Sequence, residues 1–110
     1  MAYDEVLADR IRDVVEVETG MSERRMFGGL AFLVNGNMAV AASGQGGMML
    51  RIDPKDVESL TGREHVERME MHGRAMDGWL RVHDPAFEND ADLRDWVQIG
   101  LAYARSLPAK

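Results

Sequence analysis

The sequence has no cysteine among its 110 residues. Disulfide frameworks, thiolate metal sites and cysteine nucleophiles are therefore excluded, which fits a reducing compartment. Long hydrophobic runs are absent as well, because the longest apolar stretches, 30–34 and 38–42, fall far short of the ~20 residues that a membrane-spanning helix needs. The N-terminal segment contains acidic Asp4, Glu5 and Asp9 and lacks the positive flank and apolar stretch of a signal peptide. We expect a cytoplasmic protein.

Positive charge is scarce, with 13 basic residues against 19 acidic ones and a formal net charge of -6. The field of the whole molecule should therefore repel nucleic acids and anionic membranes. We expect neither direct nucleic acid binding nor membrane association. A chain of this length, with 45% hydrophobic and 29% charged residues, is typical of one folded globular domain, which we expect to span residues 1–110.

Known catalytic motifs are absent. The four serines lie in no G-x-S-x-G or Ser-x-x-Lys motif, and the glycines of segment 44–47 are not followed by the Gly-Lys-Ser/Thr of a phosphate-binding loop. That segment is better interpreted as a mobile hairpin loop. The three histidines, His65, His72 and His83, have neighbouring acids but match no metal-binding signature, so surface histidines are the preferred interpretation. We expect a non-enzymatic protein with no cofactor and no metal.

Helical signals mark three segments. Residues 4–19 carry apolar residues at helical spacing, which predicts an amphipathic helix on a sheet, ended by Gly20 in a left-handed conformation. Asp53-Pro54 predicts the start of a short helix that ends at Gly62. A last helix is expected from Asn89 or Asp90 to about Leu107, and its apolar stripe consists of Leu93, Trp96, Val97, Leu101 and Ala104.

Strand signals occupy the regions between these helices. Asn35-Gly36, which tolerates the positive φ angles of a type I′ turn, separates the apolar runs 30–34 and 37–42 and predicts a β-hairpin. Further strands are expected at 24–27, 48–52 and 79–82, whereas 63–73 is compatible with either a helix or a strand. The predicted fold class is α+β, with two layers, an antiparallel sheet with flanking helices, and the order α-β-β-β(-β)-α-β(-β)-α.

Methionine and arginine are the residue types that could form an interaction surface. Among nine methionines, we expect Met26, Met38, Met48 and Met49 in the core, and Met69, Met71 and Met76 are the better candidates for an exposed patch. Five arginines could gather near one sheet edge and bind phosphate or a carboxylate-rich partner, or each could pair with one of the abundant acids. They are Arg24, Arg25, Arg51, Arg74 and Arg81.

Three segments together resemble a known family. They are Arg25-Met26-Phe27-Gly28-Gly29, the run from Gly73 to Trp79, and a closing helix that contains Leu93 and Trp96-Val97. This combination resembles the N-terminal domain of the TfoX/Sxy competence regulators from about Arg10 to Arg105, and Met-Phe-Gly-Gly is its most specific part. Two adjacent glycines also suit a sharp turn or a close approach of two backbones, so the motif can be explained by structure alone.

The resemblance implies a two-layer α+β domain that promotes expression of DNA-uptake genes by assisting a cyclic-AMP-responsive activator. We therefore expect a non-enzymatic regulatory or adaptor domain that acts by protein–protein interaction in transcriptional or competence-type control. The given sequence ends at Lys110 without the second, C-terminal domain of full-length regulators, so we expect a stand-alone N-terminal domain.

The alternative is a small-molecule or metal-binding domain, or an enzyme, with a pocket near Phe27, Arg74 and Trp79. A homodimer formed through an unprotected sheet edge is also expected. The candidate binding residues are Arg24, Arg25, Met26, Phe27, Gly28, Gly29, Arg74 and Trp79.

Overall fold

The computed structural model describes residues 3–26, 28–71 and 73–110. Its helices are α1 (Glu5–Val15), α2 (Val57–Thr61) and α3 (Asp90–Ser106), and short 3-10 turns, η1 (Pro54–Asp56) and η2 (Asp84–Phe87), precede α2 and α3. The strands are β1 (Met21–Met26), β2 (Gly29–Val34), β3 (Asn37–Ala42), β4 (Met48–Arg51), β5 (Val66–Met71) and β6 (Arg74–Val82). This element order confirms the predicted α+β architecture.

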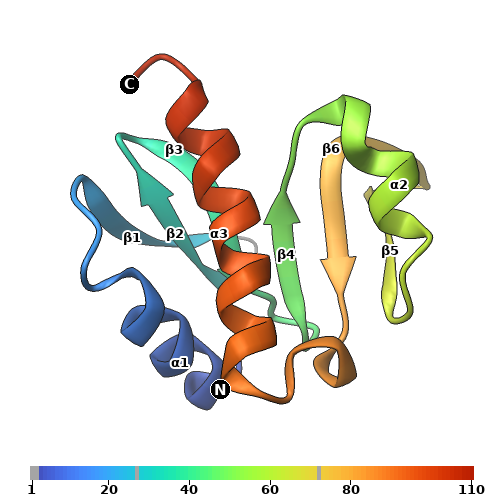
Figure 1. The fold of residues 1–110 in the computed structure, drawn as a ribbon, viewed down its shortest axis with the longest axis horizontal. Coiled ribbons are helices and arrows are strands. Elements are labelled where there is room, and N and C mark those ends of the chain that lie inside the picture. The colour runs from blue at the N-terminus through green and yellow to red at the C-terminus, as the bar shows by residue number, and fades with distance from the viewer. Residues whose placement is uncertain (1–2, 27, 72) are drawn as a thin grey trace.

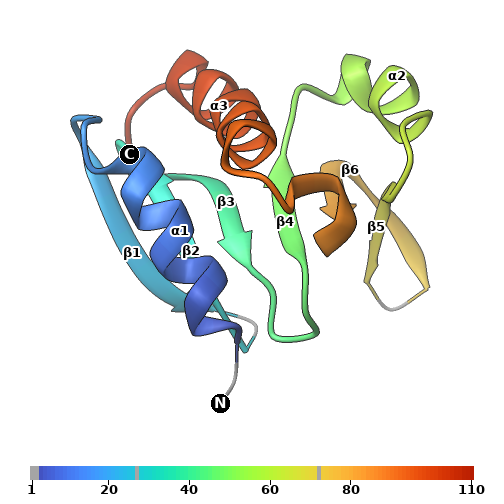
Figure 2. The same ribbon diagram turned by 60° about the horizontal axis from the view of Figure 1, so that its bottom comes forward.

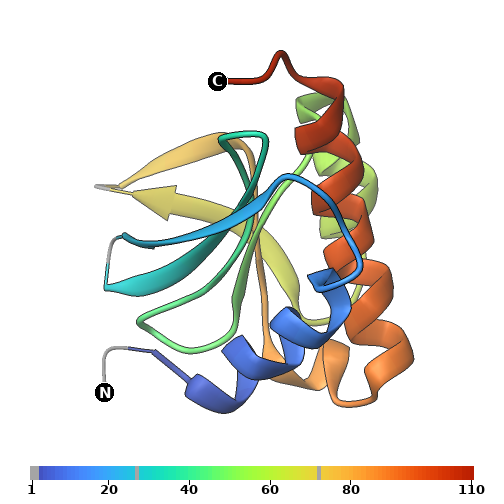
Figure 3. The ribbon, with the colours of Figure 1, turned by 90° about the vertical axis from the view of Figure 1, so that its left-hand side faces the viewer.

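The six strands form one antiparallel sheet in the order β1-β2-β3-β4-β6-β5 (Figure 1). Helix α3 packs on β2, β3 and β4, α1 packs against α3 and β3, and α2 packs against β5 and β6. Figures 2 and 3 show that α1 and α3 lie on the same side of the sheet. In Figure 3 the strands of the β1–β2 and β5–β6 hairpins extend toward the side away from α3. The sheet thus has one face covered by helices and a second, helix-free face, on which no helix of the described residues lies.

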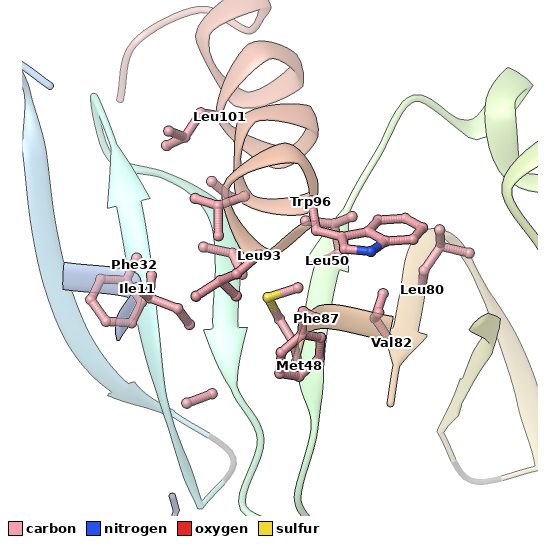
Figure 4. Close-up of a cluster of buried hydrophobic side chains, with 14 of the residues drawn as sticks. Ile11, Phe32, Met48, Leu50, Leu80, Val82, Phe87, Leu93, Trp96 and Leu101 are labelled. Carbon is pink, nitrogen blue, oxygen red and sulfur yellow. The ribbon is translucent and has the colours of Figure 1, made fainter. Parts of the chain in front are cut away.

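The main hydrophobic core lies between the helices and the sheet (Figure 4). Alternate residues of each strand face this layer, as the two-residue period of a strand requires. Each large side chain removed from water there contributes about 1.5–3 kcal/mol. The core includes Ile11, Phe32, Met48, Leu50, Leu80, Val82, Phe87, Leu93, Trp96 and Leu101.

Local signals account for most element boundaries. Asn35 and Gly36 both have positive φ, +53° and +84°, and their flanking residues pair directly, which confirms the predicted turn between β2 and β3. Helix α3 begins where the Asn89 side chain accepts a hydrogen bond from the backbone N–H of Asp92 at 2.8 Å. Asp53 caps η1 in the same way, through the N–H of Lys55 at 3.1 Å, and Gly62 ends α2.

Two predictions near the N-terminus and in the middle of the chain needed correction or resolution. Helix α1 ends at Val15 instead of continuing to residue 19, because no later residue of the segment faces the core and Val17 is 79% exposed. Gly20 has the predicted positive φ of +77°, but it lies at the start of β1, where its carbonyl accepts a hydrogen bond from the N–H of Asn35. The ambiguous segment 63–73 contains strand β5.

Candidate interaction surface

The helix-free face of the sheet carries a second cluster of buried apolar side chains. Its members are all strand residues, and no helix residue of the described part of the chain belongs to it. Their exposed fractions lie between 1% and 7%, so this face is not an ordinary solvated surface. The second cluster consists of Ala31, Leu33, Ala41, Met49 and Met69.

The shape of the sheet explains how this cluster is buried. The register shifts between Phe32 and Leu33 in the β2–β3 pair and between Arg68 and Glu70 in the β5–β6 pair, and such irregularities increase the bend and twist of a sheet. The outer β1–β2 and β5–β6 hairpins extend toward the side away from α3 (Figure 3), and they contribute Ala31, Leu33 and Met69 to the cluster. The central strands are therefore apolar on both faces, which is typical of strands buried on both sides.

Three larger apolar side chains surround the second cluster and remain half-buried. Met26, Met38 and Trp79 pack against the cluster and keep part of their surface in water. Methionine adapts its shape to different partners, and tryptophan is enriched among the residues that dominate binding energy at protein interfaces. These three residues form the apolar rim of the candidate surface.

One transverse row of residues crosses this face over all six strands. Successive members are direct cross-strand neighbours in the register of the sheet, so the row runs from an arginine at the β1 edge to a glutamate at the β5 edge. Small and flexible apolar residues occupy its middle. The row is Arg24, Ala31, Ala41, Met49, Arg81 and Glu67.

Arg81 is fixed by the loop between β3 and β4. Its guanidinium donates hydrogen bonds to Ser43 Oγ at 3.1 Å, to the carbonyl oxygen of Gly46 at 3.2 Å and to Gln45 Oε1 at 3.4 Å. All three acceptors are neutral, so these contacts position the arginine without neutralising its charge. The loop connects two paired strands, which confirms the predicted hairpin connection.

A polar cleft of about 540 Å³ lies beside this arginine. Its walls include Gln45, Glu67, Arg81 and His83, and His83 Nε2 lies 3.6 Å from Glu67 Oε2. The cleft is shallow and both partners of the histidine–glutamate pair are substantially exposed. This arrangement could hold a small polar molecule through a fixed guanidinium and an adjacent acid.

The predicted binding residues are divided between the two faces. Met26 and Trp79 lie on the helix-free face. Arg24 lies there too, because it is the direct cross-strand neighbour of Ala31, a member of the second cluster. Arg25 follows Arg24 on the strand and therefore points toward the helix-covered side. Arg74 is exposed at the start of β6, and Phe27 lies outside the described residues.

The arginines do not gather near one edge. Strand order places β1, with Arg24 and Arg25, at one side of the sheet, and β6, with Arg74 and Arg81, beyond β2, β3 and β4. Arg51 lies near α3, with its guanidinium carbon 5.8 Å from the centre of the Tyr103 ring. The hypothesis of one arginine cluster is therefore wrong, because the sequence does not reveal which strands are neighbours.

The adjacent glycines of the Met-Phe-Gly-Gly motif have distinct structural roles. Gly28 has a φ of +76° and an open surrounding, so its conformation alone favours glycine. Gly29 lies so close to β3 that a Cβ atom would collide with the carbonyl oxygen of Ala42. Both glycines are thus explained by backbone geometry.

The methionines follow the prediction only in part. Met48 lies in the helix-side core and Met49 in the second cluster, as expected of core residues. Met69 is only 5% exposed, so its assignment to an exposed patch is wrong. The strand assignment of 66–71 places it on the helix-free face among the other members of the second cluster. For Met71 and Met76 the structure describes the backbone and not the side chains.

No group of three or more histidine or acidic side chains in residues 3–26, 28–71 and 73–110 is placed to hold a metal ion. In that same part of the chain, no helix combines the length and apolar character required to cross a bilayer.

The fold and surface define an α+β domain with helices on one face of its sheet and a partly exposed, methionine-lined second face. Sequence comparison identifies the family: the profile of the TfoX N-terminal domain matches residues 14–104, and the chain belongs to this family. The family is generally regulatory or competence-related and is not a known enzyme family. A search of curated proteins found no match, and neither did a search of solved structures.

Proposed function

We propose that this chain is a non-enzymatic regulatory or adaptor domain that binds a protein partner through the helix-free face of its sheet, in transcriptional or competence-type control. One observation carries the proposal. Met26, Met38 and Trp79 remain half-buried around an apolar cluster whose members in the described chain all come from strands. A partner that covers these side chains would remove their remaining apolar surface from water.

The distribution of charge supports the same proposal. The six strands contain six arginines and four acids, a sum of +2, and the rest of the chain contains seven basic and fifteen acidic residues, a sum of -8. These sums add up to the net charge of -6. The sheet is therefore the more basic layer of an acidic molecule. On the helix-free face itself, Arg24 and Arg81 of the transverse row favour acidic groups in a partner.

Site-specific photocrosslinking tests the proposed surface. A photoreactive amino acid replaces Met38 on the apolar rim, and the matched control carries it at Gln98, an exposed position of α3. We expect discrete adducts in cells with position 38, and their loss when Trp79 is also changed to serine. Equal labelling from both positions, or no adduct from position 38, would count against the proposed surface.

The regulatory part of the proposal needs a separate readout. The Met38→Glu variant introduces a charge on the apolar rim, whereas Gln98→Glu introduces the same charge on the helical layer. We expect Met38→Glu, expressed at its natural level, to reproduce the changes in transcript abundance caused by deletion of the gene. Gln98→Glu should leave the transcripts unchanged. Deletion without any effect on transcripts would contradict a regulatory role.

A second candidate function is the binding of a small polar molecule in the cleft beside Arg81. The fixed guanidinium next to Glu67 and His83 favours it. The pocket expected near Phe27, Arg74 and Trp79 includes Phe27, which lies outside the described residues. A metabolite at 100 times its dissociation constant should stabilise the protein by about 2.7 kcal/mol in a thermal-shift screen. The shift should disappear in Arg81→Gln and persist in Arg94→Gln, whose arginine is exposed on α3.

A further inference from the structure

The two edge strands of the sheet each have one partner in the described part of the chain. Strand β1 pairs with β2, and β5 pairs with β6. The outer side of each strand therefore carries backbone N–H and C=O groups that can pair with another chain. Every neighbouring pair in the six-stranded sheet is antiparallel, so β1 and β5 run in opposite directions.

Two hydrogen bonds show which residues direct their backbone groups outward. The carbonyl of Gly20 accepts from the N–H of Asn35 in the direction of β2, so the N–H of Met21, on the same peptide group, points outward. Alternation along β1 then directs Glu23 and Arg25 outward as well. At the other edge, the carbonyl of His65 accepts from the N–H of His83.

The same peptide geometry applies to β5. The N–H of Val66 points away from β6 because the carbonyl of His65 points toward it, and alternation also directs Arg68 outward. The residue between them, Glu67, faces Arg81 and lies at the end of the transverse row. Arg24, Arg25, Glu67 and Arg68 are all exposed.

One register of β1 against β5 pairs the outward-directed backbone groups and also keeps the helix-free faces of the two copies on the same side. If β1 of one copy lies antiparallel to β5 of another, the outward residues pair as Glu23 with Arg68 and as Arg25 with Val66. Between these pairs, Arg24 lies opposite Glu67 on the helix-free face. Two neighbouring pairs thus have opposite charge, and the transverse row continues from one copy into the next.

Symmetric edge pairing is less favourable. Two β1 strands centred on residue 23 or 25 would place two glutamates or two arginines directly opposite each other, and centring on residue 24 would oppose two Arg24 side chains between two Glu23–Arg25 pairs. Two β5 strands centred on Glu67 or Arg68 would do the same. Like charges in directly opposed positions destabilise a strand pair. Each of these symmetric registers contains such a pair and the β1–β5 register contains none, so the edge sequences favour the pairing of unlike edges.

We propose that copies of this chain assemble head to tail, with β1 of one copy paired to β5 of the next in the register that sets Arg24 against Glu67. The contact is heterologous, so it forms a ring if the rotation between copies closes and an open chain if it does not. The sheet and its helix-free face then continue from copy to copy. This assembly is independent of the proposed regulatory partner, which binds the face and not the edges.

Sedimentation velocity and light scattering test the assembly. The wild-type mass should rise above the 12.3 kDa of one chain as concentration increases. Arg24→Glu and Glu67→Arg should each stay monomeric, and an equimolar mixture should regain association because each altered edge then finds an opposite charge. Arg94→Glu changes the net charge as much as Arg24→Glu does, but at an exposed position of α3, and it should associate like the wild type. Circular dichroism confirms that each variant is folded.

Disulfide crosslinking gives a second measurement that does not depend on charge reversal. The chain has no cysteine, so Arg24→Cys and Glu67→Cys each introduce a single thiol. Residues 24 and 67 of neighbouring copies would form a pair without backbone hydrogen bonds, in which side chains approach closely enough for a disulfide. Oxidation of the mixed variants should yield heterodimers in excess over the statistical mixture.

Three results would overturn the proposal. One is a wild-type mass that stays at 12.3 kDa up to the solubility limit. Another is association that is lost in Arg24→Glu but unchanged in Glu67→Arg, which would indicate a symmetric β1 dimer. The third is a statistical yield of crosslinked species from the two cysteine variants.

Discussion

Arg12 of α1 and Glu23 of β1 form a two-point ion pair that ties the first helix to the edge of the sheet. Arg12 Nε lies 2.7 Å from Glu23 Oε2, and Arg12 Nη2 lies 2.9 Å from Oε1. The hydrogen bonds from Arg12 hold the pKa of the Glu23 carboxyl below its ordinary value, while partial burial opposes the shift. The hydrogen bonds that Arg12 donates to Glu23 and Asp9 raise the pKa of Arg12 above its ordinary value.

The first prediction concerns the pH dependence of this pair. Because the pKa of Glu23 is lowered by folding, its ionised form stabilises the protein above the unfolded-state value near 4.5, and this stabilisation is lost as the pH falls through the lower folded-state pKa. Glu23→Gln should therefore be slightly less stable than the wild type at pH 7, and the difference should vanish on acidification. Urea denaturation over a pH series measures it, with Glu16→Gln, also exposed, as the control. A difference independent of pH would contradict the assignment.

The two glycines of the Met-Phe-Gly-Gly motif should respond differently to alanine. Gly29→Ala drives a methyl group into the carbonyl oxygen of Ala42, and such overpacking costs about 1–3 kcal/mol or more. In Gly28→Ala the new methyl group meets no atom within 4 Å. The loss of stability, about 1–2 kcal/mol, comes mainly from the positive φ of this residue. Gly28→Asn should recover part of that loss, because asparagine tolerates this region, whereas Gly29→Asn should not. Chemical denaturation of the four variants provides the comparison.

Gly100 provides a third prediction, in which helix propensity and packing oppose each other. Alanine in place of glycine stabilises a helix interior by about 1 kcal/mol. At this position, however, the new Cβ would lie 2.5 Å from the carbonyl oxygen of Ala39 and 2.8 Å from Leu50 Cδ1. Overpacking costs about 1–3 kcal/mol, so once the gain in propensity is subtracted Gly100→Ala should lower the free energy of unfolding by up to about 2 kcal/mol. A higher free energy of unfolding would show that α3 can move away from β3 without penalty.

The fourth prediction tests whether the second cluster contributes to stability. Met69 is 5% exposed although it lies in an edge strand and belongs to a cluster whose described members all come from strands. Its truncation to alanine should cost about 2–5 kcal/mol, as for a residue in a conventional core. Arg68→Ala, an exposed neighbour on the same strand, should change stability by less than about 0.5 kcal/mol. Equal effects of the two variants would mean that the helix-free face is a solvated surface.

Local signals in the sequence are sufficient for most of the secondary structure. Asn35-Gly36 and Asn89 act through their own backbone geometry and hydrogen bonds, so their roles can be predicted without knowledge of the tertiary fold. The end of α1 could not be predicted in this way, since Val17 continues the apolar composition but faces solvent. What ends that helix is the extent of the core beneath it.

The candidate surface was predictable only in part. Met26 and Trp79 were identified from composition and family resemblance, but Leu33, Met49 and Met69 acquire their role from the curvature of the sheet. The uninterrupted apolar sequence of β2 was the available signal, because a strand that is apolar at every position has both faces buried. The opposition of Arg24 and Glu67 at the two edges depends on strand order, which no local pattern encodes.

The position of β6 between β4 and β5 has a consequence for the growing polypeptide. The ribosome releases β5 before β6, yet β5 cannot join the sheet until β6 has paired with β4 through the four residue pairs from Met48–Val82 to Arg51–Trp79. Until then, a nascent chain that has formed its first four strands exposes the apolar edge of β4. Translation arrest between residues 52 and 82 would therefore release a fragment that is prone to aggregate, whereas completion of the β5–β6 hairpin protects that edge.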